Sequence, residues 1–401
     1  HPAIPDPLWS RGLGDVYKRQ DLDGRELIDM SIMGIGTNLL GYGNEEVDEA
    51  VRRTINLGNM STLNCPEEVF LAEKLIEIHP WAEMARFARS GGEANAISIR
   101  IARASSGKDK IAICGYHGWH DWYLATNLQN DSNLSEHLLP GLDPIGVPKN
   151  LSGTTFPFQF NNFQQLLKIV DNNDLAAIKM EVERSNPPEN DFLGKVRDLC
   201  DKKNIILIFD ECTSGFRETL GGIHLKHNVS PDICMFGKAL GNGYAITSVI
   251  GKKKFMQAAQ KTFISSTFWT ERIGPTAALK TLEVMKKLKS WEYVSALGDK
   301  VRSVWRDLAI ENNLSISIGG IKPVPQFTIN SKDFLKYKTF ITQEMLKEGY
   351  LFSNIVFISM AHNEKIFEQY NEKLKNIFKI IGECESGRCI AVSYTHLRAH
   401  E

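Results

Sequence analysis

Lys238 and Asp210 are the two residues whose types and surroundings point most directly to chemistry. Lys238 lies in the apolar, glycine-flanked segment Met-Phe-Gly-Lys-Ala-Leu-Gly. Desolvation lowers the pKa of such a lysine and favours the neutral amine, which attacks a carbonyl group to form a Schiff base. Asp210 follows the apolar run 205–209, and ligands of open parallel sheets bind beyond the carboxyl ends of strands. Taken singly, the two residues also fit a surface lysine and an ordinary strand end.

Two further segments could bind a ligand. Ser90, Gly91 and Gly92 open an apolar helical pattern, and the free N–H groups of a helix start suit a phosphate. Taken singly, this segment is better explained as an ordinary helix cap. The segment 115–122, Gly-Tyr-His-Gly-Trp-His-Asp-Trp, follows a predicted strand, and its rings could stack on a planar cofactor or pack in a core corner. Since no other His or Cys cluster supports its two histidines, we predict no metal site.

Short apolar runs alternate with amphipathic stretches over most of the chain. We expect buried strands at 110–114, 176–180, 205–209 and 246–250, and helices at 93–104, 163–170 and 192–203. This alternation predicts an α/β fold, a large domain with a mainly parallel central sheet flanked by helices. From about Gly274 onward, helical patterns at 275–288 and 364–382 and mixed segments between them predict a smaller α+β domain.

The composition favours a small-molecule site. The chain has 401 residues with 47 basic and 48 acidic side chains, and this balance argues against nucleic acid or an anionic membrane surface as the partner. No apolar run approaches the roughly 18 to 20 residues of a membrane span. The seven cysteines form no CxxC pair. We therefore expect a cytoplasmic protein.

The two ends of the chain differ from its body. Residues 1–20 and 391–401 resemble translated adaptor sequence at the edges of a metagenomic contig, and we predict that both are non-native. Between them we expect an N-terminal segment of the small domain at 21–60, the large cofactor-binding domain at 61–285 and the C-terminal small domain at 286–390.

In order and spacing, these motifs resemble the class III (ω-type) aminotransferases, which are fold-type I pyridoxal-phosphate enzymes. The resemblance begins at Asp21-Leu-Asp-Gly-Arg-Glu-Leu-Ile-Asp and extends to about residue 390. Its most specific part is Ile-Phe-Asp-Glu-Cys-Thr-Ser-Gly-Phe-Arg at 208–217, followed by Pro-Asp-Ile-Cys-Met-Phe-Gly-Lys-Ala-Leu-Gly-Asn-Gly at 231–243.

The resemblance implies roles for individual residues. Lys238 would hold pyridoxal 5'-phosphate as a Schiff base and move the substrate proton, and Asp210 would pair with the pyridinium nitrogen. The turn at Ser90, Gly91 and Gly92 would bind the phosphate. Three other residues complete the implied site: Tyr116 over the pyridine ring, His117 beside it, and Glu181 as a supporting carboxylate. Thr267 would reach the phosphate of the neighbouring subunit, which implies a homodimer with shared active sites.

Two departures from the family pattern accompany this resemblance. Many relatives carry Thr or Ser at the position of Gly92, so that a phosphate-binding hydroxyl is missing here, and Val182 stands where a proline is usual. The segment 146–157 with Asn161 and Asn162 is similar to the glutamate-1-semialdehyde aminomutase-like branch.

The activity expected from this resemblance is amino transfer between a small-molecule amino donor and a keto or aldehyde acceptor. Intramolecular transfer by a glutamate-1-semialdehyde 2,1-aminomutase is the alternative, because both reactions use the same lysine and aspartate. A non-catalytic pyridoxal-phosphate-binding protein is a further alternative.

Overall fold

The computed structural model describes residues 18–130, 133–135 and 142–387, and the chain divides into two compact units. The large unit is Glu45–Lys289, and the small unit combines His1–Asn44 with Ser290–Glu401. Helix α2 (Glu45–Asn56) packs against α10 (Ile273–Leu288) inside the large unit. The division after Asn44 therefore assigns residues 45–60 to the large unit, whereas the sequence analysis expected them in the small domain.

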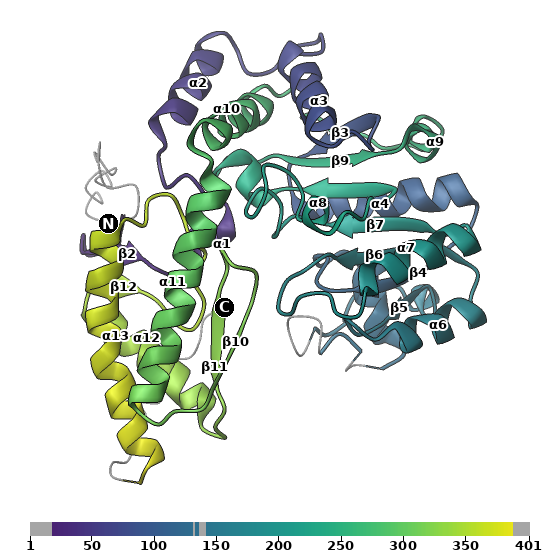
Figure 1. The fold of residues 1–401 in the computed structure, drawn as a ribbon. Helices are drawn as coiled ribbons and strands as arrows, with labels where there is room; N and C mark the ends of the chain where they lie inside the picture. The colour runs from purple at the N-terminus through teal and green to yellow at the C-terminus, as the bar shows by residue number, and fades with distance from the viewer. Residues whose placement is uncertain (1–17, 131–132, 136–141, 388–401) are drawn as a thin grey trace. The chain divides into compact units, whose positions relative to one another are not determined.

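A seven-stranded sheet forms the centre of the large unit (Figure 1). Its strand order is β3-β9-β8-β7-β6-β4-β5. The strands are β3 (Met84–Ala88), β4 (Lys110–Cys114), β5 (Thr155–Pro157), β6 (Leu175–Glu181), β7 (Ile206–Asp210), β8 (Ile233–Phe236) and β9 (Thr247–Gly251). Neighbours from β5 to β8 are parallel, and β9 runs antiparallel to both β8 and β3. The predicted mainly parallel sheet is confirmed.

Helices cover both faces of this sheet. In Figure 1, α4 lies behind the sheet, and α6 and α7 lie in front of it. The longer helices are α2, α3 (Pro66–Ile78), α4 (Gly91–Ser106), α6 (Phe163–Asn172), α7 (Phe192–Lys203) and α10. The short ones are α5 (Asp121–Leu124), α8 (His224–His227), α9 (Lys253–Met256), η1 (Ala125–Leu128), η2 (Lys149–Leu151), η3 (Lys238–Gly241) and η4 (Gln257–Gln260). Covered on both faces, β6 and β7 are buried along their whole length.

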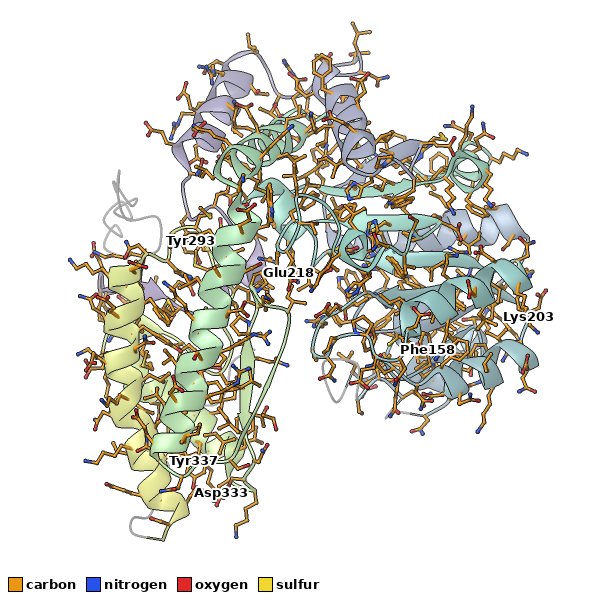
Figure 2. The ribbon with its side chains drawn as sticks, in the orientation of Figure 1. Phe158, Lys203, Glu218, Tyr293, Asp333 and Tyr337 are labelled. Atoms are coloured by element: carbon orange, nitrogen blue, oxygen red, sulfur yellow. The ribbon has the colours of Figure 1, made fainter. Side chains whose placement is uncertain are left out.

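The small unit has two small sheets and four helices among its described residues. One sheet has the order β1-β2-β12, and the other pairs β10 with β11. Its strands are β1 (Lys18–Gln20), β2 (Glu26–Asp29), β10 (Ile316–Gly319), β11 (Gln326–Ile329) and β12 (Tyr350–Leu351), and its helices are α1 (Met33–Gly36), α11 (Ser290–Glu311), α12 (Phe334–Lys347) and α13 (Glu364–Glu385). Tyr337, labelled in Figure 2, donates a hydrogen bond of 2.6 Å to Glu385 and so joins α12 to α13.

Most of the predicted elements are present, with small shifts at their ends. The helix expected at 192–203 has those bounds, and the strand expected at 205–209 is Ile206–Asp210. The predicted non-native ends fall outside the described residues, except for Lys18–Gln20, which pair with β2. Among the described helices, none combines the length and apolar character that a membrane crossing requires.

Candidate active site

Asp210 ends β7 at the carboxyl edge of the sheet and is only 4% exposed. One carboxylate oxygen, Oδ2, lies 2.8 Å from His117 Nδ1, and the other accepts a hydrogen bond of 3.1 Å from the backbone N–H of Cys212. Burial opposes ionisation, but the hydrogen bond from His117 and the charge of Lys179 outweigh it, so that the pKa of Asp210 lies below its usual range. Asp210 is therefore a buried carboxylate that stays ionised.

His117 lies on the loop after β4 and is fully buried. Because an ionised carboxylate only accepts hydrogen bonds, Nδ1 of His117 must carry the proton that it shares with Asp210. The other ring nitrogen, Nε2, is buried without a hydrogen-bond partner in the described part of the chain. A buried polar atom without a partner is costly and calls for an explanation.

Lys238 is the first residue of η3, two positions after the end of β8. Its backbone has a φ of +44°, which is uncommon for a residue with a side chain. The Nζ atom lies 2.9 Å from Thr213 Oγ1. Burial lowers the pKa of Lys238, and the positive charges of Arg184 and Arg217 lower it further. The neutral amine expected from the sequence is thus favoured by this environment.

The start of α4 lies close to the ends of β7 and β8. The side chain of Ser90 caps the helix by accepting a hydrogen bond from the backbone N–H of Glu93, and its backbone carbonyl accepts one of 3.2 Å from Thr247 Oγ1. The backbone N–H groups of Gly91 and Gly92, in the first turn, have no intrahelical acceptor. The sulfur of Cys212 lies 3.9 Å from where a Cβ on Gly91 would be. A helix start with unused donors therefore faces the Asp210 side of the sheet.

His120 occupies the space that a side chain at position 92 would need. A Cβ on Gly92 would lie 2.3 Å from His120 Cε1 and 2.7 Å from His120 Nδ1. The imidazole stacks on Trp119, with ring centroids 4.6 Å apart, and its Nδ1 atom is buried without a partner among the described residues. The glycine that departs from the family pattern is therefore matched by a histidine packed directly on it.

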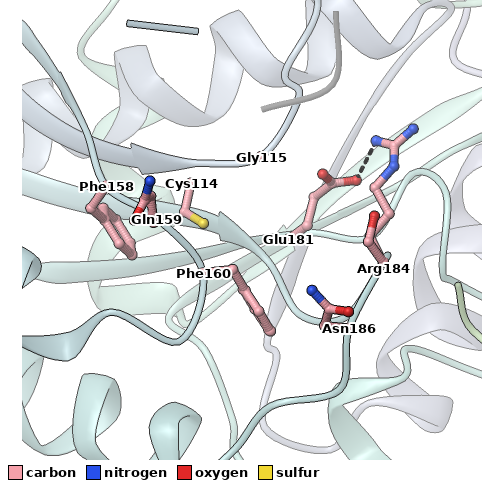
Figure 3. A pocket seen from close by; sticks show the side chains of 9 residues that line it. Cys114, Gly115, Phe158, Gln159, Phe160, Glu181, Arg184 and Asn186 are labelled. Atoms are coloured by element: carbon pink, nitrogen blue, oxygen red, sulfur yellow. Dashed lines mark hydrogen bonds and ion pairs between the residues drawn. The ribbon is translucent and has the colours of Figure 1, made fainter. Parts of the chain in front are cut away.

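Glu181 ends β6 beside a cavity of about 300 Å³ (Figure 3). Its Oε2 accepts a hydrogen bond of 3.1 Å from the backbone N–H of Tyr116, and its Oε1 lies 2.8 Å from Arg184 Nη1. Gly115, with a φ of +111°, passes so close that an added Cβ would lie 2.5 Å from the Glu181 carboxylate. The cavity is lined by Cys114, Gly115, Phe158, Gln159, Phe160, Glu181, Arg184, Ser185 and Asn186.

The structure thus brings the predicted residues Asp210 and His117 into direct contact and gathers the helix start around Gly91 nearby. Thr267 is exposed. Tyr116 is half-buried, and its ring meets Tyr123 edge-on with centroids 6.0 Å apart.

Three nearby residues were not singled out from the sequence: Lys179, Arg184 and Thr213. His120 belongs to the segment 115–122 that was singled out, but it received no role of its own. Two of the three residues not singled out carried a signal. Lys179 interrupts an apolar strand, and Arg184 follows Glu181 by three positions.

Comparison with known proteins identifies the family. The family model "Aminotransferase class-III" matches residues 7–320, so the chain belongs to the class III aminotransferases, a family of pyridoxal-phosphate enzymes. The chain is 33% identical to a 3-aminobutyryl-CoA aminotransferase of Cloacimonas acidaminovorans, over 88% of this chain and 83% of the relative. It is 29% identical to a glutamate-1-semialdehyde 2,1-aminomutase of Methanococcus maripaludis, over 91% and 90% of the two chains.

The fold is also that of this family. A structure of the FumI protein of Sphingopyxis sp. MTA144, in its PLP internal aldimine form, superposes with a TM-score of 0.82. The match covers 92% of this chain and 88% of that one at 22% identity. The predicted fold-type I architecture is confirmed.

The residues present fit the cofactor of this family. Pyridoxal phosphate brings an aldehyde, a basic ring nitrogen and a phosphate. The site offers a lysine whose pKa is lowered by burial, an ionised aspartate and a helix start with unused N–H donors. It also contains two buried imidazole nitrogens that lack partners among the described residues.

Proposed function

We propose that this protein is a pyridoxal-phosphate-dependent aminotransferase that moves an amino group between an amino donor and a keto or aldehyde acceptor. The observation that carries this proposal is that a lysine and an aspartate at one edge of the sheet are held in opposite protonation states. Lys238 is held towards its neutral form, whereas Asp210, at the end of the adjacent strand, is held ionised. Carbonyl and proton-transfer chemistry need these two states together.

Lys238 supplies the amine and the base. When bound, the cofactor offers an aldehyde for amine exchange and a ring that accepts the electron pair released when the substrate C–H bond breaks. Neutral Nζ of Lys238 takes up the proton from the substrate carbon and returns it to the neighbouring position. Thr213 Oγ1, 2.9 Å from Nζ, orients the amine.

Asp210 would hold the cofactor's ring nitrogen and favour its protonated form. The hydrogen bonds from His117 and from the N–H of Cys212 fix the orientation of the carboxylate. Each carboxylate oxygen retains a lone pair beyond these bonds, which leaves acceptor capacity for the ring N–H. Tyr116 would stack on the cofactor ring.

The start of α4 binds the phosphate. The N–H groups of Gly91 and Gly92 and the positive end of the helix dipole favour a dianion, and Ser90 fixes the helix start by capping it. His120 Nδ1, buried beside Gly92, supplies a further polar atom where the usual hydroxyl is missing.

The cavity beside Glu181 receives the substrate. Within the described part of the chain, Arg184 donates one hydrogen bond, to Glu181. A guanidinium group has five N–H donors, so others remain available to a substrate. A planar fork suits a substrate carboxylate. Glu181 supports the site from its backbone anchor at Tyr116.

We further propose a cytoplasmic homodimer with shared active sites, in which Thr267 reaches the phosphate bound by the neighbouring subunit. The exposure of Thr267 in the single chain supports this role, because a residue that serves another subunit must be accessible before assembly.

The decisive experiment replaces the amine. Purified protein mixed with pyridoxal phosphate should absorb in the visible, and Lys238→Ala should lose this absorption and the amino-transfer activity. Lys202→Ala, which changes an exposed lysine of α7, is the matched control and should retain both. A visible band that persists in Lys238→Ala would contradict the proposal.

An aminomutase is the second candidate, and it is favoured by the extended similarity to glutamate-1-semialdehyde 2,1-aminomutases. The two candidates differ in whether the amino group leaves the substrate molecule. The purified protein is incubated with glutamate-1-semialdehyde alone, and separately with paired amino donors and keto acceptors. Isomerisation without an acceptor would favour the aminomutase, and donor-dependent turnover would favour the aminotransferase.

A further inference from the structure

Lys179 is a fully buried lysine in the middle of β6, with no exposed side-chain surface. Lysine is almost never fully buried without a charged partner. Its neighbours along the strand, Ile178 and Met180, are apolar and equally buried. The described residues place no carboxylate within ion-pair distance of its Nζ atom. A charge in this position needs an explanation beyond packing.

The side chain of Lys179 reaches across the neighbouring strand. Lys179 pairs with Ile208 of β7 in the sheet register, yet its Nζ lies 2.9 Å from the sulfur of Met235 in β8. Met235 is the register partner of Asp210. A contact to Ser98 Oγ of α4, at 3.3 Å, fixes the side of the sheet. The ammonium group therefore lies in the core under α4, across β7 and beside the residue that pairs with Asp210.

Asp210 is the main anion that this ammonium group meets. The groups that face Lys179 are Asp210 from β7, Glu181 from β6, Cys234 from β8 and Cys212 after β7. Burial raises the pKa of both thiols, so they are neutral at ordinary pH. Of the two carboxylates, Glu181 already has Arg184 as its partner. The direct contacts of Nζ, the hydroxyl of Ser98 and the thioether of Met235, are uncharged, and the thioether is a weak acceptor.

The coupling between Lys179 and Asp210 acts in both directions. Burial lowers the pKa of Lys179 to about 8, and the charge of Asp210 is the strongest influence that opposes this fall. The charge of Lys179 in turn helps to keep the pKa of Asp210 low. A group with a pKa near 8 changes its charge within the range in which enzymes work.

We propose that Lys179 is a positioning residue: its buried ammonium group lies beneath Asp210, stabilises the ionised carboxylate and sets how much of that negative charge remains for the cofactor's ring nitrogen. The inference rests on the proposed function for the role of Asp210, but the coupling of the two side chains belongs to the chain itself. At low pH, charged Lys179 shares the negative charge of Asp210. At high pH, neutral Lys179 leaves that charge to the ring nitrogen.

The methyl group of Met235 offers a direct probe, because its sulfur contacts Nζ. The full-length chain, freed of cofactor, is labelled with ¹³C at the methyl groups of its ten methionines. The Met235 signal is assigned with Met235→Leu and followed from pH 6 to 10. We expect it to titrate with a midpoint near the pKa of Lys179, about 8.

Variants then identify the charge that controls this midpoint. Asp210→Asn should lower the midpoint by about one pH unit or more, which is a tenfold loss of proton affinity. Glu181→Gln, the matched control, should lower it less, because Glu181 is already paired with Arg184. Lys179→Leu should abolish the titration, and Lys110→Leu, which changes a lysine of β4, should leave it unchanged.

Three results would overturn the proposal. These are a Met235 signal that does not titrate, a midpoint that Asp210→Asn leaves in place, and a larger shift in Glu181→Gln than in Asp210→Asn. The comparison of the wild type with Asp210→Asn needs no Lys179 variant, so it decides the question even if Lys179→Leu fails to fold. It also needs no bound cofactor, so a failure of the proposed function would be seen separately, in the Lys238→Ala absorption.

Discussion

Two buried carboxylate–histidine pairs stand side by side at the end of β7, and they differ in how completely their hydrogen bonds are used. Asp210 pairs with His117 at 2.8 Å, and the next residue, Glu211, pairs with His224 at 2.5 Å. Successive residues of a strand point to opposite faces of a sheet. The Asp210 pair faces the site that contains Lys238, and we call it the open pair. We call Glu211 and His224 the closed pair.

The closed pair is fully hydrogen-bonded. The second ring nitrogen of His224 accepts a hydrogen bond of 2.9 Å from Trp81. Glu211 also accepts hydrogen bonds from the N–H of Ile223 and from Ser214 Oγ. In the open pair, by contrast, Nε2 of His117 is buried and has no partner among the described residues. The closed pair therefore stabilises the fold with all of its hydrogen bonds made. The open pair keeps a ring nitrogen, His117 Nε2, that a ligand can bind.

Glu211, His224 and Cys234 also place potential metal-binding atoms within 4.8 Å of one another. Both ring nitrogens of His224 are engaged in hydrogen bonds, and burial raises the pKa of the Cys234 thiol. A thiol binds metal as the thiolate. Hydrogen bonding within the protein therefore accounts for this cluster.

The largest expected effect comes from removing one histidine of each pair. His224→Ala should destabilise the cofactor-free protein by about 3 kcal/mol, because it leaves Glu211 buried without its partner. His117→Ala should cost clearly less stability, since one of its ring nitrogens has no partner to lose, but it should weaken cofactor binding. Urea unfolding and titration with pyridoxal phosphate measure the two effects. Equal losses of stability would remove the distinction between the pairs.

The sequence predicted both residues of the open pair as site residues, but it did not predict that they contact each other. Asp210 ends an apolar run, and the strand, its burial and its place at the carboxyl edge all follow from that pattern. His117 is 93 positions away, and only the parallel order β4-β6-β7 brings the two together. The placement of Lys179 could have been predicted. It is a single charge within an apolar strand, two positions before Glu181, so it must lie on the same face of the sheet as that glutamate.

Domain boundaries were less predictable than the strands. Glu45–Asn56 is an amphipathic helix, and its apolar face fits either unit equally well as far as local pattern is concerned. Its packing against α10, more than 200 positions away, is what assigns it to the large unit. The unit against which a helix packs is therefore not encoded in its local sequence pattern.

The second prediction concerns how the stability of the protein falls at low pH. It tests His79, whose ring lies beside that of His224 in the closed pair. This buried histidine accepts a hydrogen bond from the N–H of Gly222, and its ring lies 5.6 Å from that of His224. Burial lowers the pKa of folded His79 to about 4, whereas the unfolded residue binds its proton near 6.5. Between these values the unfolded state binds more protons, so the stability that His79 contributes is complete above pH 6.5 and falls as the pH is lowered.

The matching variant is His79→Gln, which does not titrate. Its stability difference from the wild type should shrink by about 2 kcal/mol between pH 7.5 and pH 5, because the wild type alone loses stability through this group. Urea unfolding of the cofactor-free chain at several pH values measures the difference. A gap that stays constant with pH would show that His79 has the same pKa in the folded and unfolded states, so that burial does not lower it.

The third prediction concerns Arg184 and tests whether its remaining N–H donors bind the substrate carboxylate. Arg184→Gln should raise the KM for alanine about tenfold, because hydrogen bonds to charged groups contribute about 1.5 to 3 kcal/mol. The KM for isopropylamine, which has a methyl group in place of the carboxylate, should change little. Steady-state kinetics with the two donors give the ratio. An equal rise for both donors would assign Arg184 to the support of Glu181 rather than to substrate binding.

The smallest expected effect tests the match between Gly92 and His120. Gly92→Ser should weaken binding of pyridoxal phosphate, because the new Cβ lies 2.3 Å from the His120 ring, and His120→Ala should weaken it about fivefold through loss of one hydrogen bond. In the double variant the serine has room, and its hydroxyl stands at the helix start. Affinity should therefore return towards the wild-type value, so that the two changes are not additive. Titration of the cofactor-free variants measures all four affinities. A double variant that binds more weakly than either single variant would show that His120 does not replace the missing hydroxyl. The unpartnered Nδ1 atom of His120 would then reflect packing on Gly92 alone.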